Sequence, residues 1–329
     1  MDGLYKIFPE ESEEFPWDER ALEDFKKLIN ENGIKCRMDD IFLLGFLRAR
    51  KFNLEESLQL LKNYYSRRIE YSSFFKNLLP SKLEGILHLN CYKILPKPDQ
   101  NGRIIGLIEI KQWNPSETLV IHLCRASFLS LELLLNLHRM QENGLIVIIN
   151  TQGITLRHML QITPRFANTM ISLIFRNSSQ IRIKEIHYVN VNRIVKILET
   201  ILMPLLPVKI QKRIFLHSEM TALHKFIHPK YLPIEYGGEL TNLDPNEFIN
   251  IVKQNEDFFR KNEEYVKMFE ESTQQRFSKR RFKYIGSDIV NRKEILLENS
   301  EKQDIENSLV EVKSMNVPGE SIKGSAAIL

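Results

Sequence analysis

The six residues 145–150, "LIVIIN", constrain the fold of this chain more than any other segment. All but the last of them are apolar, and Gly144 separates them from the leucine-rich segment that precedes them. A short run without polar alternation has no face to turn toward water, so it is typical of a strand in the middle of a sheet that is covered on both faces. The covering helices must come from the flanking sequence, and the predicted fold class is therefore α/β.

The flanking segments alternate between strand and helix patterns. Residues 91–110 contain two β-rich runs on either side of Asn101-Gly102, which predicts a hairpin. A leucine-rich helix is expected over about 116–143, with Gly144 as its C-terminal cap. Because strands that alternate with helices form layers, we predict a mixed, mainly parallel sheet. The later elements expected are a helix over 164–177, a strand over 181–190 and a helix over 193–203.

Residues 17–79 precede the sheet and carry apolar side chains at helical spacing. Asp18 can cap a first helix, and the aspartates at 39–40 can open a second one. Asn53 can cap a third, with Glu56 at the position of a capping box. We therefore predict a separate module of three helices.

Composition limits the class of protein. With 329 residues, 43% of them hydrophobic, the chain can build a sizeable core, and its formal charge of +4 is too small to indicate nucleic acid by itself. Cys36, Cys91 and Cys124 lack the spacing of a metal site or a disulfide framework, which favours a reducing compartment. The acidic N-terminus predicts no signal peptide, and no apolar run approaches the ~20 residues that span a bilayer. We expect a cytoplasmic protein that can associate with a membrane surface.

Four regions follow from these patterns: an N-terminal segment 1–16, the helical module 17–79, an α/β domain 80–240 and a C-terminal region 241–329. The last region contains a helix near 245–270, followed by a polar, flexible tail. Residues 276–286 of the tail mix basic and aromatic side chains, which fits either an anionic membrane or RNA contact or a solvated linker. The C-terminal "AAIL" is a weak signal for strand addition to a peptide-binding groove.

The sequence has no motif for a common enzyme class. It contains no GxGxxG, P-loop, GxSxG or HExxH pattern. His224 and His228 are four residues apart and could share a helix face, but no carboxylate or thiol with ligand spacing lies near them, and Pro229 ends that helix. We therefore expect no enzyme, no bound metal and no cofactor.

Basic side chains are the more informative polar feature. The alternation "IRIK" places Arg182 and Lys184 on one face of a strand, and "VKIQKR" places Lys209, Lys212 and Arg213 at i, i+3 and i+4 of a helix. If the two segments meet, their cations form a patch suited to a phosphorylated headgroup. If they do not, they are a solvated helix face and a snorkelling pair, and the residues alone leave both interpretations open.

The apolar segment 195–210 contains Pro204 and Pro207, which makes it a poor uninterrupted core helix. It fits either a movable lid or a kinked core helix, and the pattern does not decide between them.

Several of these segments together resemble the CRAL-TRIO lipid-binding family, in its α-tocopherol transfer protein-like and clavesin-like branch. They are "FLLGFLRARKFNLEESLQLLKNYY", "NGLIVIINTQGITLRHMLQITP", "IRIKEIHYVN", "KIQKRIFLHS" and "LPIEYGG", and they cover about residues 18–240 in consistent order. The resemblance implies a three-helix module on a lipid-binding domain. In that domain a mixed, mainly parallel sheet forms the floor of an apolar cavity, which a helical gate closes.

The resemblance also assigns roles to single residues. It implies phosphoinositide binding by Arg182, Lys184, Lys209 and Arg213, whereas a further basic position of the family is Gln59 in this chain. The implied cavity residues are Cys124, Ser127, Leu131, Ile171, Ile174, Phe175 and Ile181, and the implied gate residues are Leu198, Leu202 and Leu206.

This sequence departs from the family pattern at several positions. Leu131 replaces a family serine, Asn150 replaces an acidic residue, and Gln180 and Asn192 replace prolines. The cavity is therefore expected to be more apolar than that of the tocopherol binder, and the resemblance does not name the ligand.

The predicted function is to bind a hydrophobic lipid and transfer it between membranes, with phosphoinositide headgroups on the basic patch promoting exchange. The expected partners are the lipid and a phosphoinositide-containing membrane surface such as the endosomal one, without nucleic acid. The alternative is a trafficking adaptor in which the lipid is structural and the C-terminal tail binds a protein partner.

Overall fold

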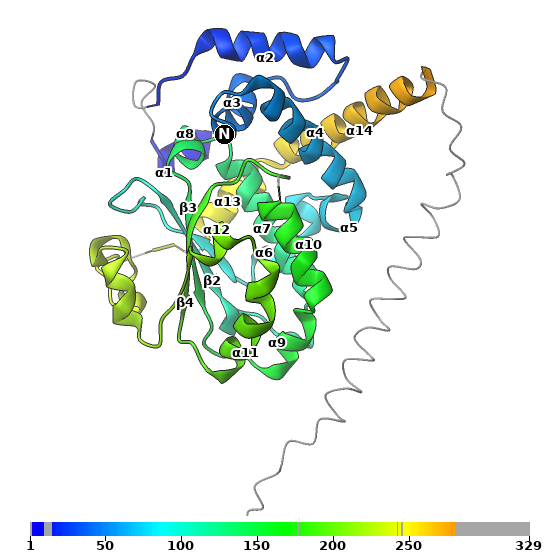
Figure 1. Ribbon diagram of the computed structural model, residues 1–329. Coiled ribbons are helices and arrows are strands. Elements are labelled where there is room, and N and C mark those ends of the chain that lie inside the picture. Colours follow the sequence, from blue (N-terminus) through cyan, green and yellow to red (C-terminus); the bar gives the residue numbers. More distant parts are fainter. Residues whose placement is uncertain (1, 10–14, 177, 242, 245, 280–329) are drawn as a thin grey trace, which may run out of the picture. The chain divides into compact units, whose positions relative to one another are not determined.

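A mixed five-stranded sheet organises the middle of the chain in the computed structural model (Figure 1), which describes residues 2–9, 15–176, 178–241, 243–244 and 246–279. The strand order along the sheet is β1-β2-β3-β4-β5. The first two strands are antiparallel, and β2 to β5 are parallel. The strands are β1 (Tyr92–Ile94), β2 (Ile104–Glu109), β3 (Leu145–Asn150), β4 (Ile183–Val189) and β5 (Ile214–Leu216). The apolar run 145–150 is the central strand, as its composition predicts.

The hairpin between β1 and β2 is confirmed. Its turn contains Gly102 with φ of 70°, a left-handed conformation that favours glycine. The side chain of Asp99 accepts hydrogen bonds from the backbone N–H groups of Asn101 and Arg103. These bonds stabilise the turn and bring β2 back beside β1.

The three predicted N-terminal helices are α2 (Glu19–Glu31), α3 (Asp40–Ala49) and α4 (Leu54–Glu70). Asp18, Asp39 and Asn53 cap them with side-chain oxygens that accept backbone N–H groups of the first turn. One cluster of apolar side chains from these helices includes Phe269 of a C-terminal helix, so the module is packed against the end of the described chain.

The leucine-rich stretch 116–143 is two helices, not the single one expected. They are α7 (Val120–Leu134) and α8 (His138–Glu142). The amide of Asn136 donates to the backbone oxygens of Glu132 and Leu133, so a side chain satisfies carbonyls that a continuing helix would have used. The helical spacing of apolar residues did not reveal that the Asn136 side chain competes for these carbonyls.

The C-terminal helix predicted near 245–270 is also two helices, α13 (Glu247–Gln254) and α14 (Glu256–Lys279). Most of the predicted tail, including "AAIL" and residues 280–286 of the basic segment, lies outside the described residues. The other helices are α1 (Asp2–Ile7), α5 (Ser72–Phe75), α6 (Glu84–Leu87), α9 (Leu156–Gln161), α10 (Pro164–Phe175), α11 (Arg193–Leu202) and α12 (Val208–Gln211). Short 3₁₀ turns occur at Pro80–Lys82, Ile110–Gln112, Met203–Leu205, Met220–Lys225, Pro229–Tyr231 and Ile234–Tyr236.

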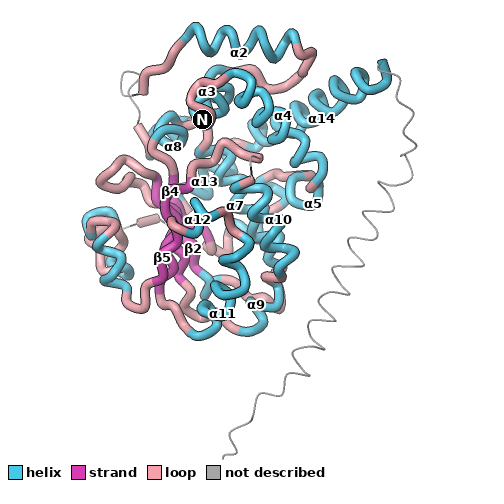
Figure 2. The backbone as a smooth tube through the Cα atoms, viewed as in Figure 1, coloured by secondary structure: helices cyan, strands magenta, loops and turns pink. Residues whose placement is uncertain are grey.

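The two faces of the sheet are covered by different structures. Helices α7, α10 and α11 lie on one side, and the 3₁₀ turns of residues 220–236 lie on the other (Figure 2). On the second side Ile105, Ile146 and Ile148 are completely buried. We call this side the sealed face, and the side beneath the helices, which carries Val147 and Ile149, the open face.

Candidate functional site

The open face keeps apolar side chains incompletely covered. Val147 and Ile149 of the central strand are only half-buried, although the residues on either side of each are buried. Their partners in the neighbouring strand are Ile186 and Tyr188, and Tyr188 is half-buried too. A central strand that remains accessible on one side indicates that the helices above it do not pack down tightly.

Five of the seven predicted cavity residues belong to one large apolar cluster, which also includes side chains of this face. Cys124 of α7 belongs to the apolar cluster that reaches the sheet. Burial raises the pKa of its thiol to about 12, so the group stays neutral and behaves as a small apolar side chain. Partly buried members of the same cluster are Leu131, Ile174, Phe175 and Ile181, together with Val147, Ile149 and Tyr188.

Two predicted cavity residues differ from that group. Ile171 is buried on α10. Ser127 is half-buried, and its hydroxyl donates to the backbone oxygen of Cys124 at 2.8 Å. The Ser127 hydroxyl is therefore already paired within α7.

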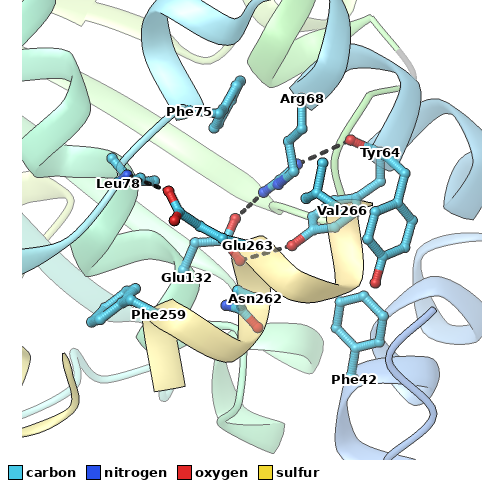
Figure 3. A pocket seen from close by; sticks show the side chains of 11 residues that line it. Phe42, Tyr64, Arg68, Phe75, Leu78, Glu132, Phe259, Asn262, Glu263 and Val266 are labelled. Carbon is cyan, nitrogen blue, oxygen red and sulfur yellow. Dashed lines mark hydrogen bonds and ion pairs between the residues drawn. The ribbon is translucent and has the colours of Figure 1, made fainter. Parts of the chain in front are cut away.

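A separate cavity of about 40 Å³ lies between α4, α7 and α14, and the predicted cavity residues do not line it (Figure 3). Arg68 lies 3.3 Å from the ring centroid of Tyr64 and pairs with Glu132, which also accepts a hydrogen bond from the Tyr64 hydroxyl. Leu78 donates its backbone N–H to Glu263 at 3.0 Å. The space suits a few water molecules, and the polar contacts in its mainly apolar lining join the N-terminal module to the domain.

Helix α11 covers the edge of the open face. Leu198, one of the predicted gate residues, is buried in a cluster that contains Tyr188 and Leu202. Leu206 lies beyond the 3₁₀ turn that follows α11 and is half-buried. On the outer side, Ile197 and Ile201 are 39% and 45% exposed. The helix also exposes Arg193, Lys196 and Thr200, so its solvent side is mixed and carries two isoleucines one turn apart.

The cations predicted from "IRIK" lie at the start of β4, but not in the expected alternation. The β3–β4 register shifts between Leu145 and Ile146, whose partners are Ile183 and Glu185, so Lys184 is an extra residue in the ladder. Arg182 precedes the strand and donates to the backbone oxygen of Gln141 at 2.8 Å. The register shift therefore interrupts the regular strand alternation at Lys184.

The helix expected to carry Lys209, Lys212 and Arg213 is a single turn. It ends at Gln211, so only Lys209 belongs to it. The backbone oxygen of Arg213 instead accepts from the N–H of Ile186, and its guanidinium donates to the oxygen of Ile183 at 2.5 Å. Pairing with β4 ends the helix and places Arg213 beside the strand.

Positive charges do converge on Lys184. Burial and the charges of Arg182, Arg213 and Arg103 lower the pKa of its ammonium, which Glu142 partly opposes. Lys209 is exposed on α12, four residues before Arg213. The structure thus brings together three of the four predicted headgroup-binding residues and places the fourth on the adjoining turn.

The CRAL/TRIO domain profile matches residues 88–238. The human protein "Alpha-tocopherol transfer protein-like" is 35% identical over 256 residues, which cover 77% of this chain and 75% of that protein. The chain belongs to the CRAL-TRIO family. Clavesin-1 of Xenopus laevis is 36% identical over 211 residues, or 63% of each chain. The crystal structure of Sfh5 matches with a TM-score of 0.47 and 15% identity, covering 74% of this chain and 99% of that chain.

The CRAL-TRIO match contains the open face, α11 and all four predicted cations. Among the helices of residues 2–279 that the structure describes, none combines the length and the apolar character needed to cross a bilayer. In the same part of the chain, no three His, Cys, Asp or Glu side chains gather as a metal site would require. His224 contacts the backbone oxygen of Tyr236 at 3.0 Å, and His228 accepts the N–H of Lys230.

Sequence reasoning missed two residues of the charged region. Arg103 bridges Asp99 and Glu185 at 2.7 and 2.8 Å, and Glu142 pairs with both Arg48 and Arg182. The position of Arg103 directly before β2, the neighbour of the central strand, was the available signal. Glu142 gave no comparable signal, because both of its partners are distant in sequence.

Three of the departures from the family pattern have local explanations. Gln180 is buried against α3, where a Cβ on Gly45 would come within 2.0 Å of its Oε1, so glycine permits this contact. Asn150 accepts from the Asn190 amide at 2.8 Å at the end of β3. Asn192 caps α11 by accepting two backbone N–H groups.

Proposed function

We propose that this protein binds a hydrophobic lipid on the open face, beneath α11, and transfers it between membranes. The observation that carries the proposal is the contrast within one strand: Ile148 is completely buried on the sealed face, whereas Ile149 remains accessible on the other. Membership of the CRAL-TRIO family supports lipid binding as the class of function. Catalysis forms no part of the proposal.

The energetics favour a cargo that is held tightly. Burial of hydrocarbon stabilises a complex by about 0.8 kcal/mol per CH₂ group, so a lipid of about 20 carbons would dissociate slowly without assistance. Release therefore requires a change in the cover of the open face. Helix α11 is the candidate, because Leu198 faces the apolar cluster while Ile197 and Ile201 are exposed to the surroundings.

The basic residues supply a means to trigger that change. Lys209 follows Leu206 by three residues, so a group bound at Lys209, Lys184, Arg182 and Arg213 would act on the chain segment that continues from α11. We assign this patch to the phosphates of a phosphoinositide headgroup, which charge-assisted hydrogen bonds recognise. Docking promotes cargo exchange if the headgroup binds the opened cover more tightly than the closed one.

The cargo is tested directly by native mass spectrometry of the gently purified full-length chain. A bound lipid that is displaced by Ile149→Trp, with cooperative unfolding retained, is the expected result. A preparation that remains empty after exposure to mixed natural lipid vesicles would contradict lipid binding.

The headgroup site is tested with Lys184→Gln/Lys209→Gln, which removes two cations that form no ion pair with the residues that the structure describes. Lys82→Gln/Lys267→Gln removes the same charge from exposed positions on other elements. Transfer of a fluorescent lipid to vesicles that contain phosphatidylinositol bisphosphate should fall about tenfold in the first variant and little in the second. Equal transfer by both variants, with wild-type unfolding, would exclude the patch.

A further inference from the structure

A single carboxylate, that of Glu142 at the end of α8, stands between two arginines from different parts of the chain. Its Oε1 lies 2.8 Å from Nε of Arg48, and its Oε2 lies 3.6 Å from Nη1 of Arg182. The Arg48 side chain is 1% exposed, whereas those of Glu142 and Arg182 are 37% and 34% exposed. The same carboxylate therefore serves one buried and one accessible cation.

Arg48 fixes this carboxylate in place. Its guanidinium donates to the Gln141 side chain at 2.8 Å and to the Phe15 backbone oxygen at 3.1 Å, and it contacts His138 Nδ1 at 2.8 Å. A buried guanidinium needs a counter-charge, because an uncompensated charge in the interior is strongly destabilising. The charge of Arg48 therefore attracts the Glu142 carboxylate at 2.8 Å and favours its present position.

Arg182 is held less firmly. Within the part of the chain that the structure describes, it donates one hydrogen bond, to the backbone oxygen of Gln141. Its contact with Glu142 is long and half-exposed, which makes it a weak ion pair. Glu142 also acts on Lys184, whose ammonium it stabilises against the surrounding arginines. The negative charge of Glu142 thus lies within reach of two of the cations assigned to the headgroup.

We propose that Glu142 is a built-in competitor of the phosphoinositide headgroup, which limits the affinity of the patch so that the protein can leave the membrane again. An arriving phosphate has to take Arg182 from Glu142 and approach a carboxylate that Arg48 prevents from withdrawing. This inference rests on the proposed headgroup site. It adds the regulation of that site by a residue outside the predicted cations.

The test is Glu142→Gln, which removes the charge and retains a side chain of the same size beside Arg48. Binding to vesicles containing phosphatidylinositol bisphosphate should become about two- to fivefold tighter at 0.1 M salt, the range expected for a half-exposed ion pair. The gain should vanish toward 1 M salt, where the screening length is about 3 Å. Dissociation from the vesicles should slow by a similar factor.

Glu31→Gln, at the exposed end of α2, is the matched control because it makes the same change in net charge. The Glu142→Gln variant leaves Arg48 without its counter-charge and could fail to fold for that reason. In that case Arg48→Gln/Glu142→Gln, which removes both charges together, is expected to show the same tighter binding. In an Arg182→Gln background the effect of Glu142→Gln should shrink, since the contested cation is gone.

The outcomes separate this inference from the proposed function. If Lys184→Gln/Lys209→Gln binds the vesicles as tightly as the wild-type protein does, the headgroup site itself is overturned. If the lysine variant binds more weakly but Glu142→Gln binds with wild-type affinity, only the competitor role of Glu142 is overturned. An equal gain in Glu31→Gln would do the same, because the effect would then be one of net charge.

Discussion

The sealed and open faces are built by the same strands but end in different packing. On the sealed face, Leu223, Ile227 and Tyr236 from the 3₁₀ turns are completely buried against the sheet, and the Tyr236 hydroxyl donates to the buried carboxylate of Glu109. On the open face, Val147 and Ile149 retain access beneath the helices. The two faces therefore differ in the middle of β3: Ile146 and Ile148 are completely buried, whereas Val147 and Ile149 are not fully covered.

The difference arises from the covering elements. The turns of residues 220–236 follow the sheet closely because their side chains and the carboxylate–hydroxyl pair fix them at short range. The open face is covered by whole helices, and α11 exposes Ile197 and Ile201 to solvent beside Arg193, Lys196 and Thr200. The packed core and the proposed cargo site therefore lie on opposite faces of the sheet.

The largest effect is expected from a pair of neighbours on β3. Ile148→Ala should lower the free energy of unfolding by about 3–4 kcal/mol, because it leaves a cavity in a fully packed face. Ile149→Ala should cost only about 1 kcal/mol in lipid-free protein, because its side chain is already partly accessible. Urea denaturation of both variants measures the difference, and equal losses would show that the two faces are packed alike.

A smaller loss of stability is expected at acidic pH, and its origin should lie in a histidine pair on the sealed face. His187 is buried on β4, and its Nδ1 lies 2.9 Å from Nε2 of His217. Burial and the neighbouring His187 lower the pKa of His217. The unfolded chain therefore binds a proton that the folded chain resists, so stability is full above the ordinary histidine pKa and falls as the pH drops below about 6.5.

The measurement is the free energy of unfolding from pH 7.5 to 5, where His217→Gln should reduce the slope. His138 contributes to the same acid loss, because burial and the charge of Arg48 lower its pKa to about 4. His138→Gln is therefore the companion variant that separates the sheet from the N-terminal contact. A slope unchanged in His217→Gln would remove the histidine pair from the explanation.

Local signals in the sequence were sufficient for much of the fold. The apolar run 145–150, the hairpin at Asn101-Gly102 and the caps Asp18 and Asn53 each depend on residues within a few positions, and each was found as predicted. The single helix expected over 116–143 failed because Asn136 offers a side-chain alternative to the backbone bonds. Periodicity reports the spacing of apolar residues and contains no information about side chains that compete for backbone hydrogen bonds.

The candidate site was predictable only in part. The "IRIK" alternation pointed to Arg182 and Lys184, and the family resemblance assigned them a role. The extra residue in β4 depends on its pairing with β3 and cannot be inferred from alternation. Arg213 left its expected helix for the same reason, since pairing with β4 determines its place. Glu142 was missed because Arg48 lies 94 positions away in the chain, and such long-range ion pairs have no local pattern.

The smallest effect is expected at Gly106, which lies opposite Val147 on the open face. A Cβ there would meet Ile94 Cδ1 at 3.6 Å and Leu145 Cδ1 at 3.7 Å, which are ordinary contacts. Gly106→Ala should therefore raise the free energy of unfolding by about 0.5 kcal/mol, because alanine reduces the entropy of the unfolded chain. Urea denaturation checks this value. A loss above about 1 kcal/mol would mean that this part of the open face has no room for one methyl group, and the contrast with the sealed face would then be confined to the region around Ile149.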